Sequence, residues 1–111
     1  MKYSIYQINL TDEQYEDKVV LETYRSVSFN CSTESVINAK PLYSKVAVID
    51  AEDLEDVFTI GNIGPEGKIE RIAPMHSVSV GDVVVDKNGY ASVCMPMGFK
   101  QFGKQGEFCG I

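Results

Sequence analysis

Residues 83–95, "VVVDKNGYASVCM", constrain the fold more than any other part of the chain. Two arms that contain valine or tyrosine flank Asp86 to Gly89, and the pair Asn88-Gly89 is a strong signal for a tight turn. The segment therefore predicts a β-hairpin. A hairpin commits this part of the chain to an antiparallel sheet.

The residues on either side of the hairpin extend this pattern. "SVSV" (77–80) alternates as a strand does, and Gly81-Asp82 then predicts a tight turn. After the hairpin, "MGFKQF" predicts another short arm, in which Gly98 permits a bulge or a close approach. The last residues look loose, apart from Phe108.

Two further segments predict strands. Residues 2–9 alternate apolar and polar positions and are rich in Tyr and Ile, which half-buried pleated surfaces favour. Residues 42–50, "LYSKVAVID", have the same character. For residues 18–24, "KVVLETY", a strand and a continuing helix both fit the pattern, so the sequence leaves this segment open.

Local capping signals predict two short helices. Thr11 and Gln14 have the spacing of a capping box, which predicts a turn of helix over residues 12–17 anchored by Tyr15 alone. "STESVINAK" predicts a second short helix capped by Ser32 or Thr33. Pro41 is expected to force Lys40 out of helical geometry.

The clearest helical pattern is "DAEDLEDVFTIGN", residues 50–62. We expect Asp50 to cap this helix and Asp53 to occupy its third position. Leu54, Val57 and Phe58 form one apolar stripe that is expected to face the core. Gly61 is expected to end the helix in a left-handed conformation, with residues 61–68 continuing as a loop.

Together these elements predict an α+β fold: one antiparallel sheet of four to six strands with one or two helices on one face. With 111 residues and no composition shift that would mark a linker, residues 1–111 are expected to form a single domain.

Composition narrows the choice of partners and compartment. Sixteen acidic residues against ten basic ones give a net charge of −6, which disfavours direct binding to nucleic acid. No apolar run approaches the ~20 residues that cross a membrane, and the first residues lack the apolar core of a signal peptide. We therefore expect no membrane association and a cytoplasmic location, in which the three cysteines stay reduced.

The candidates for catalysis and metal binding lack a motif. His76 with Cys94 or Cys109 as nucleophile and Asp82 as orienting group would be the minimal set for a cysteine hydrolase, yet no local signature surrounds any cysteine. A zinc site would draw on His76 and the three cysteines, Cys31 included, but no C-x-x-C or H-x-x-x-H pair is present.

Glycine-rich segments and lysines likewise favour structural interpretations. Residues 61–64 and 98–110 do not match a phosphate-binding loop and predict turns, so no cofactor is expected. Lys100 and Lys104 near Phe99 and Phe102 fit a strand with apolar residues inside and lysines outside better than a patch for single-stranded nucleic acid.

An acidic cluster is the best candidate for a binding surface: Asp50, Glu52, Asp53, Glu55 and Asp56. Part of it is explained as the solvated amino end of a helix, where the helix dipole stabilises negative charge. Binding of a cation, mimicry of nucleic acid and attraction of a basic partner remain alternatives, although the D-x-D-x-D-G spacing of calcium loops is absent.

Three segments in order also resemble one known family: "MKYSIYQINL", "DLEDVFTIGNI" and "MHSVSVGDVVV...GYASVCMPMGFKQF". This combination is similar to the YodL-like family of small bacterial and phage proteins. The resemblance implies a compact α+β domain carried on phages, plasmids and conjugative elements, often beside antirestriction functions. It implies no established catalytic activity and no active site.

The match includes the segment from His76 to Asp82, for which roles in turns and amide capping suffice. Residues 11–41 depart from the family pattern, which makes them a second candidate for the partner-facing surface.

The leading hypothesis is therefore a small accessory protein of a phage or mobile element that binds a host protein, through an acidic surface suited to a basic partner. Antirestriction or another modulation of the host is the process that the resemblance implies. The alternative is a small cysteine-dependent enzyme that uses His76 with Cys94 or Cys109. Self-association to a homodimer through an exposed strand edge is compatible with the first hypothesis.

Overall fold

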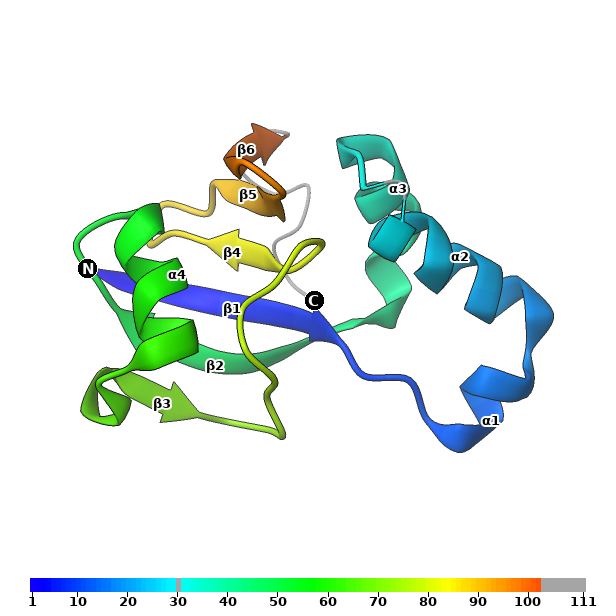
Figure 1. Ribbon diagram of the computed structural model, residues 1–111, viewed down its shortest axis with the longest axis horizontal. Helices are drawn as coiled ribbons and strands as arrows, with labels where there is room; N and C mark the ends of the chain where they lie inside the picture. Colours follow the sequence, from blue (N-terminus) through cyan, green and yellow to red (C-terminus); the bar gives the residue numbers. More distant parts are fainter. Residues whose placement is uncertain (30, 103–111) are drawn as a thin grey trace.

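A six-stranded antiparallel sheet with the order β3-β2-β1-β4-β5-β6 forms the centre of the computed structural model, which describes residues 1–29 and 31–102 (Figure 1). The strands are β1 (Lys2–Ile8), β2 (Tyr43–Asp50), β3 (Ile69–Arg71), β4 (Val83–Val85), β5 (Ala91–Met95) and β6 (Gly98–Phe102). The predicted α+β class is confirmed, with the strand number at the upper end of the expected range.

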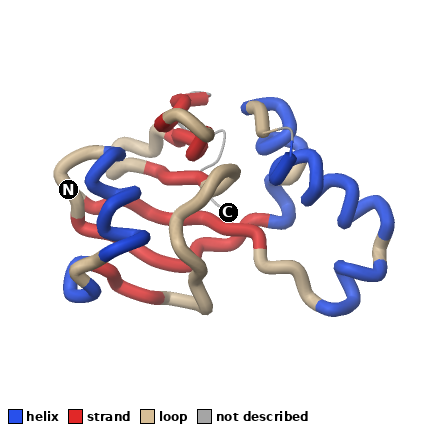
Figure 2. The backbone as a smooth tube through the Cα atoms, viewed as in Figure 1, coloured by secondary structure: helices blue, strands red, loops and turns tan. Residues whose placement is uncertain are grey.

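Four α-helices lie in the described residues, with a short 3-10 helix after α3 and another after α4 (Figure 2). They are α1 (Asp12–Glu16), α2 (Lys18–Phe29), α3 (Thr33–Asn38), η1 (Lys40–Leu42), α4 (Leu54–Ile63) and η2 (Glu66–Lys68). None of the described helices combines the length and the apolar character needed to cross a membrane.

The two faces of the sheet bury separate apolar clusters. Because side chains alternate along a strand, Val84 of β4 faces one cluster with Val57 and Ile60 of α4, while Val83 and Val85 face the other. The second cluster takes in residues of α2 and α3, which extend from one end of the sheet (Figure 1). β1 lies between β2 and β4 and contributes to both clusters.

The connection from β3 to β4 has to pass over β2 and β1, and it does so on the same face as α4 (Figures 1 and 2). Asn9 Nδ2 donates to the carbonyl of Pro74 at 3.0 Å, and Asn62 Nδ2 donates to the carbonyl of Val78 at 3.0 Å. These bonds fasten the connection to the end of β1 and to α4.

Within this connection, the predicted turn at Gly81-Asp82 is confirmed, because Asp82 N donates to Ser79 O at 3.0 Å. The alternating residues 77–80 form no strand. A side chain holds their backbone instead, because Ser79 N donates to Asp82 Oδ2 at 2.9 Å.

The predicted helix of residues 50–62 exists, but it starts later than expected. Asp53, not Asp50, is the cap, since its Oδ1 accepts from Asp56 N at 2.8 Å. Asp50 is the last residue of β2, paired with Lys2 of β1, so it cannot also begin the helix.

The apolar stripe and the end of this helix also differ from the prediction. Phe58 is 43% exposed, and Ile60 rather than Phe58 joins Val57 in the core. The helix continues through Gly61, so the left-handed stop expected there is wrong, and it ends at Gly64, which has a positive φ of 99°.

The open segment, residues 18–24, belongs to helix α2. Asp17 Oδ1 accepts from Val19 N at 2.9 Å, which supports the first turn, and Val27 with Tyr24 packs on the second apolar cluster. The predicted caps Thr11 and Ser32 are confirmed, each within a capping box.

Lys40 and Gly98 both differ from what the sequence suggested. The expectation for Lys40 is wrong, because it begins the 3-10 helix η1, in which Pro41 takes an early position that needs no amide hydrogen. Gly98 makes no close approach: it begins β6 opposite Met95. Lys104, Phe108 and Cys109 lie outside the described residues.

The predicted hairpin is confirmed as β4, a turn and β5. Asp86 N donates to Tyr90 O at 3.0 Å, and Asp86 Oδ1 accepts from the amides of Asn88 and Tyr90 at 2.8 and 3.0 Å. Cys94 lies in β5 as expected, and Lys100 on β6 is exposed while its neighbour Phe99 is half-buried.

Substitution of Gly61 by alanine tests the contact between α4 and the connection. A Cβ at this position would lie 2.3 Å from Cγ2 of Val78, a stiff and buried side chain. We expect Gly61→Ala to lower the free energy of unfolding by about 1–3 kcal/mol, measured by urea denaturation. Gly67→Ala is the control, because no atom lies within 4 Å of its added Cβ, and it should change stability by less than about 0.5 kcal/mol. Equal effects of the two changes would contradict the contact.

Candidate functional site

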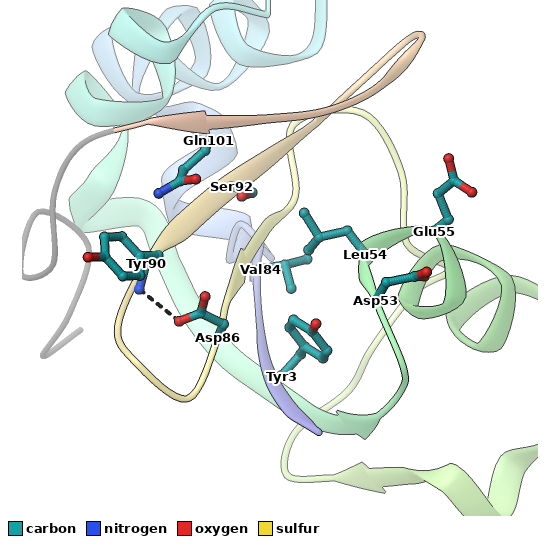
Figure 3. Close-up of a pocket in the computed structure, with 9 residues that line it drawn as sticks. All are labelled: Tyr3, Asp53, Leu54, Glu55, Val84, Asp86, Tyr90, Ser92 and Gln101. Carbon is teal, nitrogen blue, oxygen red and sulfur yellow. Dashed lines mark hydrogen bonds between the residues drawn. The ribbon is translucent and has the colours of Figure 1, made fainter.

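A groove of about 520 Å³ opens on the α4 face of the sheet, between the start of α4 and the hairpin (Figure 3). Asp53, Leu54 and Glu55 border it from the start of α4, and Asp86 and Tyr90 border it from the hairpin. Side chains of β1, β4, β5 and β6 form its floor.

Backbone bonds hold two of the groove's carboxylates in place while leaving one oxygen of each unused. Oδ1 of Asp53 caps α4, and Oδ1 of Asp86 accepts from two amides of the hairpin turn. The second oxygen of each makes no hydrogen bond with the described residues, and neither does the carboxylate of Glu55. No lysine or arginine is among the described residues that line the groove. The groove is therefore strongly electronegative.

Two hydroxyl groups on the floor complete the site. Tyr3 and Ser92 are each only 6% exposed, and no described residue forms a hydrogen bond with either hydroxyl. In Figure 3 the ring of Tyr3 is drawn between Asp86 and Asp53. Burial first, and then the charges of Asp53 and Asp86, raise the pKa of the Tyr3 phenol, so it stays protonated at neutral pH.

The five acidic residues singled out from the sequence are only partly brought together. Asp53 and Glu55 line the groove. Asp56 accepts from Glu52 N at 3.0 Å, which completes the start of the helix, and neither of these residues lines the groove.

Asp50 is engaged elsewhere. It accepts from the amino group of Met1 at 3.1 Å, and this hydrogen bond, followed by the positive charges of that amino group and Lys2, lowers its pKa.

Sequence reasoning missed Asp86, Tyr3 and Ser92 as site residues. Only the adjacency of β1 and β4 brings Asp86 near the start of α4, and no local signal carries that information.

His76 and Asp82, the polar pair of the alternative hypothesis, belong to a second network centred on Gln7. The Gln7 side chain is fully buried: its Nε2 donates to His76 O and to Asp82 Oδ2, both at 2.9 Å, and its Oε1 accepts from His76 N at 3.2 Å. The amide of Gln7 thus pairs with the connection as a neighbouring strand would.

The imidazole of His76 takes little part in this network. Its Nδ1 lies 2.8 Å from Ser77 O, to which it donates, and 4.0 Å from Asp82 Oδ2. The side chain is 45% exposed, whereas that of Asp82 is 6% exposed. Burial raises the pKa of Asp82 to about 6, against the opposing effects of the bond from Ser79, the charge of His76 and the bond from Gln7.

Cys31 and Cys94, the two thiols among the described residues, do not have the features of nucleophiles. Cys94 is 2% exposed, and burial, followed by the charges of Asp82 and Cys31, raises its pKa to about 11. Reactive cysteines have the opposite shift. No hydrogen bond joins Cys94 to His76 in the described part of the chain. Cys31 is also a free thiol with a pKa raised by burial, and its Sγ lies 3.7 Å from Met95 Sδ.

The described residues contain no group of three or more His, Cys, Asp or Glu side chains arranged to hold a metal ion. The acidic residues of the groove are therefore spread over its rim and do not converge on one point.

Comparison of the chain with family models, with curated proteins and with solved structures found no significant match. The similarity to the YodL-like family therefore stays a prediction from the sequence.

The Gln7 network makes stability depend on pH in a defined direction. The pKa of Asp82 is raised from an ordinary value of 3.8 to about 6 in the folded protein. The stabilisation from its protonated form is complete below about pH 3.8 and is lost as the pH rises to about 6. In Asp82→Asn the amide oxygen can accept the same hydrogen bonds, but the side chain does not titrate. Between these pH values, we expect the free energy of unfolding of this variant to fall by roughly 1–3 kcal/mol less than that of the native chain.

Urea denaturation of both proteins at several pH values between 4 and 7 measures the difference. Asp12→Asn replaces an exposed residue of α1, and it measures how much the loss of one negative charge alone changes the free energy of unfolding. A difference between the native chain and Asp82→Asn that is independent of pH would contradict the assignment.

The buried thiol is expected to resist alkylation. With its pKa raised to about 11, Cys94 should react with iodoacetamide at pH 8 at least ~100-fold more slowly in the folded protein than in urea. Mass spectrometry of the peptide that contains Cys94 gives both rates. Fast modification of the folded protein would favour the cysteine-dependent enzyme instead.

Proposed function

We propose that the protein is a small accessory protein that acts by binding a partner protein with a basic surface, and that the groove beside the start of α4 is its contact site. The observation that carries this proposal is the set of Asp53, Glu55 and Asp86 around one open groove with no basic residue in its described lining. An acidic groove attracts a cationic partner and repels nucleic acid.

The likeness to the YodL-like family supports a more specific version of the proposal. In this version the protein comes from a phage or mobile element, works in the host cytoplasm and binds a host protein, with antirestriction as one process it would serve. The net charge of −6 is consistent with fast, salt-dependent association with a basic partner.

Neutralising the groove without disturbing the fold tests the proposal. Asparagine also caps helices well and can accept the hairpin's amide bonds, so Asp53→Asn and Asp86→Asn can be combined with Glu55→Gln. We expect the triple variant to lose about 10- to 100-fold in affinity for the partner captured from a bacterial lysate, measured by biolayer interferometry. Binding of the native chain should also weaken as salt shortens the Debye length to about 3 Å at 1 M.

The matched control removes the same charge from the helices at the other end of the molecule. Asp12→Asn, Glu22→Gln and Glu34→Gln change exposed residues of α1, α2 and α3. This variant should bind as the native chain does. If it loses affinity while the groove variant keeps it, the partner binds residues 11–41 and the groove proposal fails.

A further inference from the structure

Two mostly buried side chains present hydroxyl groups to the groove that have no hydrogen-bond partner among the described residues. Tyr3 and Ser92 are each more than nine-tenths buried, both line the groove, and neither hydroxyl bonds to a described residue. Each hydroxyl oxygen can accept a hydrogen bond from a group that enters the groove. The floor can therefore accept hydrogen bonds from a ligand that carries donor groups.

The rim supplies negative charge from two sides. Asp53 lies at the start of α4 and Asp86 in the hairpin, and each keeps one oxygen unused. Both carboxylates act on the phenol of Tyr3, whose pKa is raised by burial and by these two charges. Charge and acceptors thus surround one space, although they come from separate elements.

The placement of these acceptors on separate elements discriminates among cations. A metal ion needs ligands that converge, and the described residues offer no such group. A lysine ammonium also concentrates its donors at one strongly hydrated point. An arginine guanidinium is planar, carries five donors in a fork and is weakly hydrated, so it can reach carboxylates and hydroxyls on different sides.

The remaining surface of the groove suits the rest of an arginine side chain. Leu54 and Val84 offer apolar contact to its methylene groups, and Tyr90, which is 44% exposed, offers a ring face for stacking. A volume of about 520 Å³ also leaves room for residues next to the arginine.

We propose that the groove is an arginine pocket: it binds the guanidinium of one arginine on the partner protein, with Asp53 and Asp86 pairing with the charge and Tyr3 and Ser92 accepting its N–H groups. This inference rests on the proposed function and deepens it, because it names the side chain that the partner inserts. The hydroxyls of the floor contribute specificity, and the carboxylates contribute most of the attraction.

Peptide titrations test the pocket without the partner. A capped Ala-Arg-Ala peptide is added to ¹⁵N-labelled protein and followed by NMR, with capped Ala-Lys-Ala and the neutral citrulline analogue in parallel. We expect saturable shifts of the amides of Tyr3, Asp86 and Ser92 with the arginine peptide, about 5- to 10-fold weaker binding of the lysine peptide, and no saturation with citrulline.

Single substitutions then assign the roles. Asp86→Asn should weaken binding of the arginine peptide about 10-fold, and Ser92→Ala or Tyr3→Phe about 3-fold each. Ser44→Ala, an exposed serine of β2 outside the groove, is the matched control and should have no effect. The dispersion of each NMR spectrum reports whether the variant is folded. Asp53→Asn, which keeps the cap of α4, provides a second charge variant if Asp86→Asn does not fold.

Two results would overturn the arginine pocket: equal affinity for the arginine and lysine peptides, or unchanged affinity in both the charge and the hydroxyl variants. The proposed function has a separate outcome. If the arginine peptide does not bind but capture of the partner still requires the groove's charges, the pocket is wrong and the binding function stands. If the peptide binds but neutralising the groove leaves the partner's affinity unchanged, the pocket stands and the function fails.

Discussion

A buried amide on the central strand organises one face of this protein. Gln7 of β1 is completely enclosed, and a buried amide left without partners costs about 1–3 kcal/mol. Its partners are the main chain of His76 and the carboxylate of Asp82, which belong to the connection from β3 to β4. The connection therefore has to cross the sheet at this position, and the turn at Ser79 to Asp82 is placed where it can lead into β4.

This crossing decides which part of the sheet stays open. The connection and α4 lie beside each other over β1 and β2, and they pack closely enough that Gly61 has no room for a side chain next to Val78. Strands β4 to β6 continue the sheet beyond β1. The groove lies there, between the first residues of α4 and the hairpin turn. Its position is a consequence of the crossing and of the strand order.

Local signals predicted most elements but not the arrangement that makes the groove. Thr11 and Ser32 are caps and Asn88-Gly89 lies in a hairpin turn because each signal acts within a few residues. Asp50 was expected to cap α4, but it pairs with Lys2 in the sheet, and Asp53 caps the helix instead. Residues 18–24 were ambiguous because paired valines suit both structures, and the burial of Val27 against the sheet favours the helix. Asp86 comes near Asp53 only through the pairing of β1 with β4, which no local pattern encodes.

The two polar regions on this face differ in a way that bears on function. Around Gln7 the polar groups satisfy one another: Asp82 Oδ2 accepts from Gln7 and Ser79, and the neighbouring thiol of Cys94 is kept protonated by burial. Such a network positions the chain and leaves little capacity for reaction.

In the groove, backbone amides fix one oxygen of Asp53 and of Asp86, while the other oxygens and the hydroxyls of Tyr3 and Ser92 stay unused. Groups that are held rigidly but left unpaired lower the entropic cost of binding a complementary ligand. This difference supports the proposal that recognition takes place in the groove. The histidine segment holds the connection to the sheet face on which the groove is built.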